Sequence, residues 1–145
     1  MKRDYENTET INGTYGELWI DDEFIASLQS CKATYELTYA DVKRPRNLGI
    51  GKKLIECNGT GEIVCDKVNS SQIRRLSDKI KAGKTPVSTI VTKLDDPDAR
   101  GAERAALNNV TFNDLELVNF EHAALVQETL SFNFENYDLY DLMEE

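Results

Sequence analysis

The residue types that most often carry enzyme chemistry are sparse in this chain of 145 residues. His122 is the only histidine, and no obvious cysteine, serine or metal-binding partner lies near it in the sequence. Cys31, Cys57 and Cys65 form an odd set without CxxC spacing, which argues against a disulfide framework and a zinc site. They are interpreted as free thiols in a reducing cytosol. We therefore predict no catalytic set, although two carboxylates acting on a glycoside remain an open alternative.

Two short segments are similar to ligand-binding motifs but fail on spacing. Residues 49–53, GIGKK, are similar to a phosphate-binding loop. Position 46 is arginine where that motif has its first glycine, and position 53 is lysine where it has serine or threonine. An acidic cluster follows further on, made of Asp95, Asp96, Asp98 and Glu103. It lacks the EF-hand spacing and is interpreted as a turn, so neither a metal ion nor a cofactor is predicted.

Charge is unevenly distributed along the chain. The sequence has 17 Lys+Arg and 26 Asp+Glu, a formal net charge of −9 and a pI of about 4.7. Residues 105–145 contain nine acids and no Lys or Arg, and the other 17 acids balance all 17 basic residues in 1–104. An acidic pI disfavours general binding to nucleic-acid phosphates.

Length and composition predict a single domain over 1–145. The hydrophobic content of 40% argues against disorder. No run of about 20 apolar residues is present, so no transmembrane helix is expected. The polar N-terminus has no hydrophobic region, so no secretory signal is expected.

Alternating apolar and polar residues predict a mainly β fold. The alternation is regular over 31–39, and its phase is opposite over 24–28, so a β-bulge is expected near Gln29 and Ser30. Asp21 and Asp22 are expected to form a hairpin turn. The expected strands are 16–20, 24–39, 61–68, 87–94, 103–112, 115–121 and 125–135.

One helix is predicted over about 69–82. Ile73, Leu76 and Ile80 form a narrow apolar stripe, so the helix is expected to pack on a sheet. Asn69 is expected to cap it, with Gln72 as its capping-box partner, and Gly83 suits the C′ position. These elements predict the α+β class, with a β-barrel or sandwich and one packed helix.

Two segments have no regular pattern. Residues 1–13 are expected to form a mobile N-terminal arm. Residues 41–58 contain Pro45, Gly49 and Gly51 and are expected to form a long loop with a net charge of +3. The cations of this loop are Lys43, Arg44, Arg46, Lys52 and Lys53.

Several stretches, in their order and spacing, are similar to those of a known family. They are 13–21 (GTYGELWID), 58–61 (NGTG), 94–96 (LDD), 101–104 (GAER), 110–112 (VTF) and 128–138 (ETLSFNFENYD). None is diagnostic alone, but together they cover about residues 11–141. The chain resembles the tail tube (tail core) proteins of contractile-tailed phages, defective Bacillus prophage particles and phage-tail-like bacteriocins.

The resemblance implies a β-barrel-like tail-tube subunit that assembles into hexameric rings. Stacked rings would form a tube inside a contractile sheath. This inner tube would cross the target envelope and, in a phage, conduct DNA without binding it specifically. Sheath, baseplate and tail-terminator proteins are the implied partners. The implied location is the bacterial cytoplasm during assembly, then the virion tail or the released tail-like particle.

Two sets of residues are candidates for assembly surfaces. We expect Lys43, Arg44, Arg46, Lys52 and Lys53 to form an inter-ring interface with acidic C-terminal surface of the next ring. Glu128 and Glu135 are candidates for an acidic lumen wall that repels DNA phosphates, or for an acidic interface. Two alternatives stay open: a monomeric β-sandwich binding or adaptor module, and a secreted tube protein of a type VI-like injector.

Overall fold

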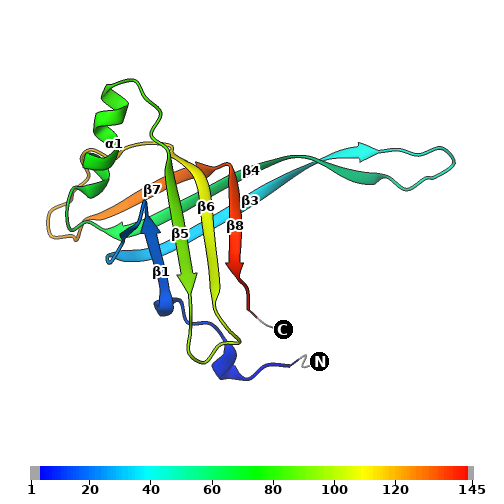
Figure 1. Cartoon of the computed structure of the whole chain (residues 1–145), viewed down its shortest axis with the longest axis horizontal. Helices are drawn as coiled ribbons and strands as arrows, with labels where there is room; N and C mark the ends of the chain where they lie inside the picture. Colours follow the sequence, from blue (N-terminus) through cyan, green and yellow to red (C-terminus); the bar gives the residue numbers. More distant parts are fainter. Residues whose placement is uncertain (1–3, 144–145) are drawn as a thin grey trace.

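The computed structural model describes residues 4–143, which form two packed sheets of antiparallel strands with an α-helix at one end (Figure 1). The strands are β1 (Gly16–Ile20), β2 (Glu23–Phe24), β3 (Leu28–Val42), β4 (Gly51–Asp66), β5 (Ser88–Leu94), β6 (Glu103–Phe112), β7 (Gln127–Phe134) and β8 (Asn136–Asp141). The helix α1 spans Ser71–Lys81, and two 3-10 helices, η1 (Asn7–Glu9) and η2 (Gly13–Tyr15), precede β1. The predicted mainly β class is confirmed.

The strands are hydrogen-bonded in the order β2-β1-β5-β6-β7-β4-β3, and β8 also pairs with β6. We call β1, β2, β5, β6 and β8 sheet A, and β3, β4 and β7 with the end of β6 sheet B. β6 belongs to both, because Thr111 and Phe112 pair with β7 after the rest of the strand has paired in sheet A. β7 also passes into β8 through one residue, Glu135. The two sheets therefore meet at a corner that two strands turn.

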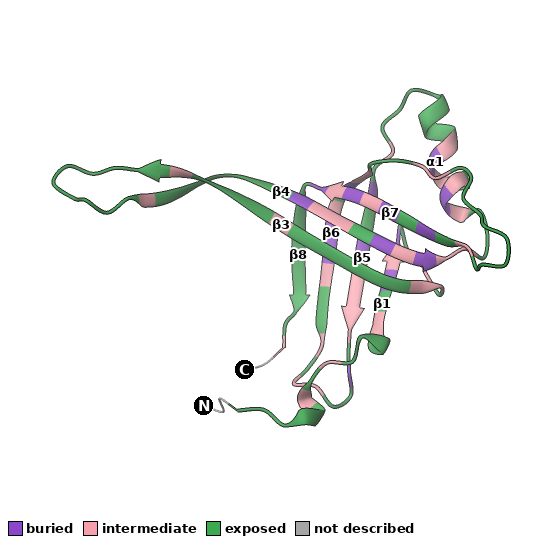
Figure 2. Ribbon diagram, turned by 180° about the vertical axis from the view of Figure 1, so that it is seen from behind, coloured by how far each residue is buried: buried purple, intermediate pink, exposed green. Residues whose placement is uncertain are grey.

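The core lies between the two sheets (Figure 2). It is built by alternate residues, since side chains on a strand point to opposite faces in turn. In β7, positions 128, 130, 132 and 134 are buried, whereas 127 and 129 are exposed. The buried cluster consists of Leu18, Ile20, Ile63, Ile90, Leu107, Val110, Leu130, Phe132 and Phe134. Burying one such side chain contributes about 1.5–3 kcal/mol.

The predicted hairpin turn and bulge are both confirmed. Asp21 and Asp22 have φ angles of 48° and 68°, the left-handed pair that a two-residue type I′ turn requires. Aspartate tolerates this conformation because its short side chain can hydrogen-bond locally. The Asp21 carboxylate accepts a hydrogen bond from the Thr89 N–H at 3.0 Å, which joins the turn to β5. The register of β3 shifts between Leu28 and Ser30, where the bulge was expected.

The helix forms as predicted, but its capping box does not. The Asn69 carboxamide oxygen accepts a hydrogen bond from the Ser71 N–H at 3.0 Å. Gln72 is buried and accepts a hydrogen bond from Arg75 instead of reaching back to the cap. Arg75 also pairs with Glu23 of β2, which ties the helix to sheet A. Gly83 has a φ of 73°, as expected for a C′ residue.

Two expectations about regular structure are wrong, and one strand was missed. Residues 41–58 are mostly strand, since β3 ends at Val42 and β4 begins at Gly51. Residues 115–121 form no strand and belong to the connection from β6 to β7. The strand β8 was not predicted at all, because no turn residues separate it from β7.

The N-terminal segment differs from a free arm over the residues that the structure describes. The Arg100 guanidinium donates to the Asp4 carbonyl at 2.8 Å and to the Glu9 carboxylate at 3.2 Å. The Asn12 N–H donates to Asp96 at 2.8 Å. These contacts hold η1 and the residues around it against the turn after β5. The first three residues of the predicted arm lie outside the described range.

Candidate assembly surfaces

β3 and β4 extend beyond the rest of sheet B as a two-stranded ribbon (Figure 1). β4 pairs with β7 only between Gly59 and Asp66, whereas its residues 51–58 pair with β3 alone. We call residues 36–58 the hairpin arm and residues 43–53 the hairpin tip. A two-stranded ribbon is at best marginally stable in water without a further strand or a packed face. The hairpin arm therefore favours contact with another surface.

One face of the hairpin arm continues the core-facing side of sheet B without being covered. Leu37 and Tyr39 follow Tyr35 at alternate positions of β3, and Tyr35 packs against the core. The cross-strand partner of Tyr39 is Leu54. Leu37, Tyr39 and Leu54 are 48%, 50% and 45% exposed, because sheet A does not reach this far (Figure 2). Contiguous exposed apolar surface of this kind indicates a protein contact.

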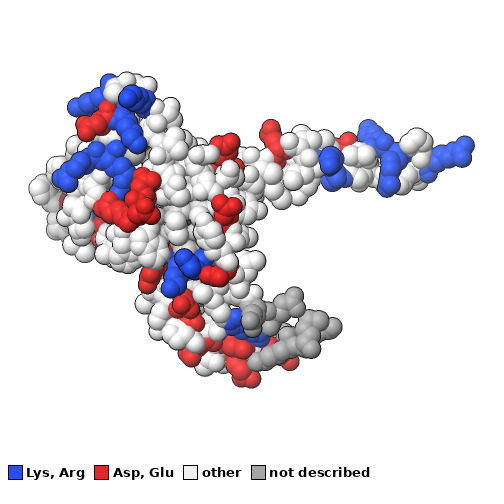
Figure 3. Space-filling model, in the orientation of Figure 1, with Lys and Arg blue, Asp and Glu red and all other residues white. Residues whose placement is uncertain are grey.

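The hairpin tip brings together all five cations that the sequence pointed to (Figure 3). Of these five cations, only Lys52 forms an ion pair within the described residues, with Asp41 on the opposite strand. The Asn47 side chain accepts a hydrogen bond from the Gly49 N–H at 2.9 Å and shapes the turn. Leu48, at the end of this turn, is fully exposed. The tip is therefore basic and also apolar.

The two acids considered for a lumen wall occupy different environments. Glu128 is 7% exposed on the core-facing side of β7, and its Oε1 lies 3.7 Å from the Lys67 Nζ. The expectation that Glu128 lies on the solvent side of this strand is wrong, because the even-numbered positions of β7 point into the core. Glu135 is exposed in the bend before β8 and accepts a hydrogen bond from the Asn109 side chain at 2.8 Å.

The outward face of sheet B is polar, and the charged side chains on it include Lys32, Glu36 and Glu62. Two rows of cross-strand partners run across it, Lys32–Glu62–Ser131 and Thr34–Thr60–Asn133–Thr111. Most of these groups are hydroxyls or amides, and the lysine faces a glutamate across the strands. Such a surface stays hydrated without concentrating charge of one sign.

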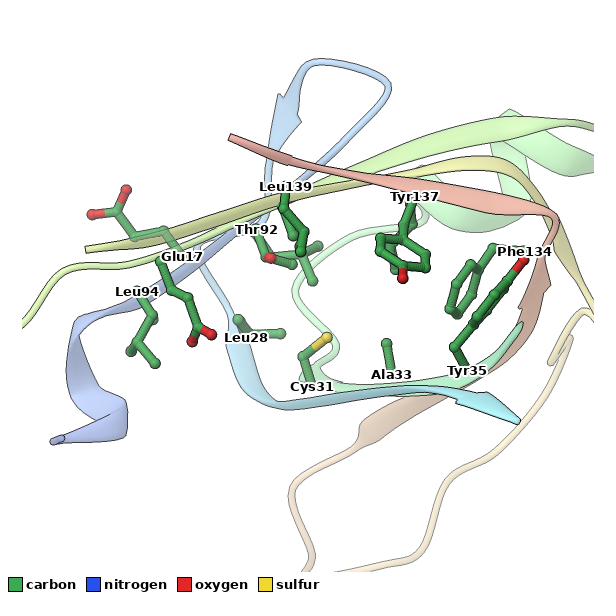
Figure 4. A pocket seen from close by; sticks show the side chains of 15 residues that line it. Glu17, Leu28, Cys31, Ala33, Tyr35, Thr92, Leu94, Phe134, Tyr137 and Leu139 are labelled. Atoms are coloured by element: carbon green, nitrogen blue, oxygen red, sulfur yellow. The ribbon is translucent and has the colours of Figure 1, made fainter. Parts of the chain in front are cut away.

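An open apolar groove of about 440 Å³ lies between β3 and β8 (Figure 4). Tyr35 on β3 stacks edge-on against Tyr137 on β8, with ring centroids 5.0 Å apart. The Tyr35 hydroxyl donates to the Glu135 carbonyl at 3.0 Å. Within residues 4–143, no backbone pairing joins β3 to β8. The sandwich is therefore open along this side.

The thiols of Cys31 and Cys65 have raised pKa values. The Cys31 Sγ points into the groove, and burial there raises the pKa of this thiol to about 11, although the residue as a whole is exposed (Figure 4). Burial also raises the pKa of the Cys65 thiol, with a further contribution from the negative charge of Glu128. Because the thiolate is the nucleophile, neither environment activates its cysteine.

The remaining candidates for chemistry have other local contacts. His122 is exposed, with its ring 6.3 Å from that of Phe120. Asp96 is buried and accepts hydrogen bonds from the N–H groups of Asn12 and Asp98, so its carboxylate organises a turn. In residues 4–143, no three His, Cys, Asp or Glu side chains are grouped to hold a metal ion. The helices in the same range are too short or too polar to cross a bilayer.

The segment 113–126 forms a surface that the sequence reasoning missed. It joins β6 to β7 at the end of the molecule opposite the hairpin tip (Figure 1). Its exposed apolar side chains are Leu117, Val118, Phe120 and Leu125. It also contains Asp114, Glu116 and Glu121, and no Lys or Arg. The apolar residues were interpreted as a strand, although Leu117 and Val118 are adjacent and do not alternate.

Comparison with known proteins identifies the family to which this chain is related. A family model described as "Phage tail tube protein" matches residues 3–141. The chain belongs to this family. The tail tube protein is also 30% identical over 132 residues to the phage-like element PBSX protein XkdM of Bacillus subtilis (strain 168), with 90% of each chain covered. The resemblance found in the sequence is thereby confirmed.

Solved structures with the same fold include chains from the anti-feeding prophage and from an extracellular contractile injection system. A chain from the tube-terminating cap of the anti-feeding prophage superposes with a TM-score of 0.74 at 8% identity, covering 96% of both chains. A chain from the sheath–tube complex of an extracellular contractile injection system superposes with a TM-score of 0.66 at 11% identity. The superposition covers 92% of the tail tube protein and 93% of that chain. At these identities the likeness establishes the fold.

Proposed function

We propose that this tail tube protein is the structural, non-enzymatic subunit of the inner tube of a contractile tail or tail-like particle. Six copies form a ring, and rings stack into a channel through the target envelope. The family match over nearly the whole chain supports the tube, and the ring order follows from the resemblance to the family.

The observation that carries this proposal is the hairpin arm. Its apolar face is uncovered in the single chain, and its two strands lack a third. Neighbouring copies supply both missing contacts in an assembly, through edge-to-edge strand pairing and packing on the apolar face. A monomeric binding module gains nothing from a segment that is marginally stable alone.

The outward face of sheet B is the surface that we assign to the channel. Its rows of hydroxyl and amide groups offer no concentrated positive charge to hold phosphates. A cargo such as DNA passes such a wall without specific binding.

The partners follow from the same proposal. The solved structures with this fold include chains from a sheath–tube complex, a sheath/tube terminator and a baseplate. We assign corresponding sheath, terminator and baseplate partners to this protein. Assembly takes place in the bacterial cytoplasm, and the tube then forms part of a virion tail or a released particle.

The test is electron microscopy of the full chain over a concentration series, alone and with its sheath and baseplate proteins. Tubes built of sixfold rings are expected. The variant Leu37→Ser/Tyr39→Ser/Leu54→Ser should lose them while keeping the unfolding transition of the body, since these side chains are already exposed. Val87→Ser, 45% exposed elsewhere, is the matched control. A chain that stays monomeric at every concentration and with every partner contradicts the proposal.

The channel assignment has its own test. Thr60→Cys is placed on the outward face of sheet B, in a chain whose Cys31 and Cys57 are changed to Ser. A maleimide attached to a particle wider than the channel should label this cysteine in the free subunit and fail to label it in intact tubes. Equal labelling of both would remove sheet B from the channel wall.

A further inference from the structure

The molecule has two complementary surfaces at opposite ends of its longest axis (Figure 1). The hairpin tip is at one end, and segment 113–126 is at the other. Both are connected to strands of sheet B, because the tip joins β3 to β4 and the segment leads directly into β7. A second copy displaced along this axis would therefore bring its segment 113–126 towards the hairpin tip of the first.

The two surfaces carry opposite charges. The hairpin tip contains five cations and no acid, and four of these cations lack an ion pair within the described residues. Segment 113–126 contains three acids and no Lys or Arg, and none of these acids is in an ion pair in the described part of the chain. Complementary charge of this kind orients an encounter between proteins and fixes its register.

The two surfaces also expose apolar side chains that their own chain leaves uncovered. Leu48 and Ile50 at the tip are 103% and 56% exposed. On the other side, Val118, Phe120 and Leu125 are 75%, 70% and 93% exposed. Aromatic and aliphatic side chains at the centre of a contact with charged residues around them are typical of protein interfaces. The hairpin tip and segment 113–126 therefore complement each other in their exposed apolar side chains as well as in their charge.

We propose that the hairpin tip of one copy binds segment 113–126 of a second copy in a head-to-tail contact. This inference rests on the proposed function and names the surface that receives the arm. The contact is heterologous, since different patches of the same chain meet, and it leaves each copy with one free patch to extend the stack.

The experiment is a charge exchange. Lys43→Glu/Arg44→Glu/Arg46→Glu leaves two cations against three acids at the tip, and Asp114→Lys/Glu121→Lys leaves one acid against two cations in the segment. Each set alone should raise the protein concentration needed for tube formation by about tenfold or more, as expected when like charges face each other across an interface. The chain that carries all five changes should recover tubes, because the signs of the two charges have been exchanged.

The control variant is Arg74→Glu/Lys79→Glu/Lys81→Glu on α1, which changes the net charge as much as the tip variant does. It should leave the tube-forming concentration within about threefold of the unmodified chain, because long-range charge is screened at physiological salt. Unmodified chain that forms tubes, with no recovery in the five-residue variant, overturns the head-to-tail contact and leaves the tube function standing. Unmodified chain that forms no assembly with any partner overturns both.

Cross-linking gives a readout that does not depend on charge. Leu48→Cys and Val118→Cys are combined in a chain whose Cys31 and Cys57 are changed to Ser. Under a mild oxidant, which accepts the two electrons released by the thiols, this chain should form disulfide-linked dimers and longer ladders. The control pairs Leu48→Cys with Ile80→Cys, which is 48% exposed on α1 at the same end. Equal ladders from both chains would overturn the assignment of segment 113–126.

Discussion

The ring of Phe132 lies so close to Gly61 that a Cβ atom at position 61 would be 2.3 Å from the Phe132 Cζ. The two residues are cross-strand partners on β4 and β7. The same relationship recurs two residues along, where a Cβ at Gly59 would be 2.6 Å from the ring of Phe134. Both rings therefore occupy the space above the backbone of β4, and a side chain there would displace them from the core.

Changing Gly61 to Ala should destabilise the subunit by about 1–3 kcal/mol, the usual cost of overpacking a core. The new methyl would meet the Phe132 ring and, at 2.8 Å, the Lys32 carbonyl oxygen, which cannot move away as a side chain can. Urea unfolding measures this change in the free energy of unfolding. Gly13→Ala is the control, because a Cβ there meets nothing within 4 Å. If both variants unfold at the same urea concentration, the close packing is not real.

Lys67→Met should cost about 1–3 kcal/mol, because it leaves the buried Glu128 carboxylate without its cation. Glu128→Gln should cost less, since it removes the buried charge and leaves Lys67, whose side chain is 27% exposed, able to reach water. Lys93→Met is the control, because Lys93 and Asp95 are mostly solvated and such pairs contribute about 0–1 kcal/mol. A glutamine variant less stable than Lys67→Met would contradict a structural role of this pair.

Arg100→Gln should release the N-terminal segment while the body stays folded. Arg100 is bound to the Asp4 carbonyl and the Glu9 carboxylate, and few other described contacts hold η1 to the body. Hydrogen exchange of the Glu9 and Thr10 amides, which close the turn of η1, should accelerate by roughly tenfold, as for local opening. Arg104→Gln breaks an exposed pair with Asp141 instead and should leave these amides unchanged.

Alkylation of Cys31 should be slow at pH 8 and should rise by about tenfold for each pH unit up to about pH 10. The rate increases with pH because the pKa of this thiol is raised to about 11, so that roughly one thiol in a thousand is thiolate at pH 8. Iodoacetamide labelling followed by peptide mass spectrometry measures each cysteine separately. In the urea-unfolded chain, the rate should level off near the ordinary pKa. A rate for the folded chain that levels off below pH 9 would contradict burial of the Sγ in the groove.

Sequence patterns predicted the elements whose apolar residues recur at a regular spacing. In 130–134 and in α1, burial of one face imposes the period. The alternation over 31–39 also gave a strand, although its apolar face is open beyond Tyr35. The change of phase placed the bulge before Ser30.

Residues 41–58 of the hairpin arm and β8 were not predictable in this way. Both faces of residues 41–58 are open in the single chain, so burial imposes no period on them, and only the breakers at the tip stood out. The turn of the chain at Glu135 needs no glycine or proline, because β7 passes from one sheet into the next without reversing. Glu128 lies on a strand that was predicted, but its burial depends on Lys67, which is distant in the sequence.

The placement of the hairpin tip and segment 113–126 at opposite ends of the subunit gives a stack built through them two unlike termini. One terminus presents basic apolar tips, and the other presents acidic apolar segments. The protein on which such a stack starts must fit one chemistry, and the protein that stops its growth must fit the other. In a stack built by the contact that we propose, a single subunit would therefore encode both the direction of growth and the need for two different capping proteins.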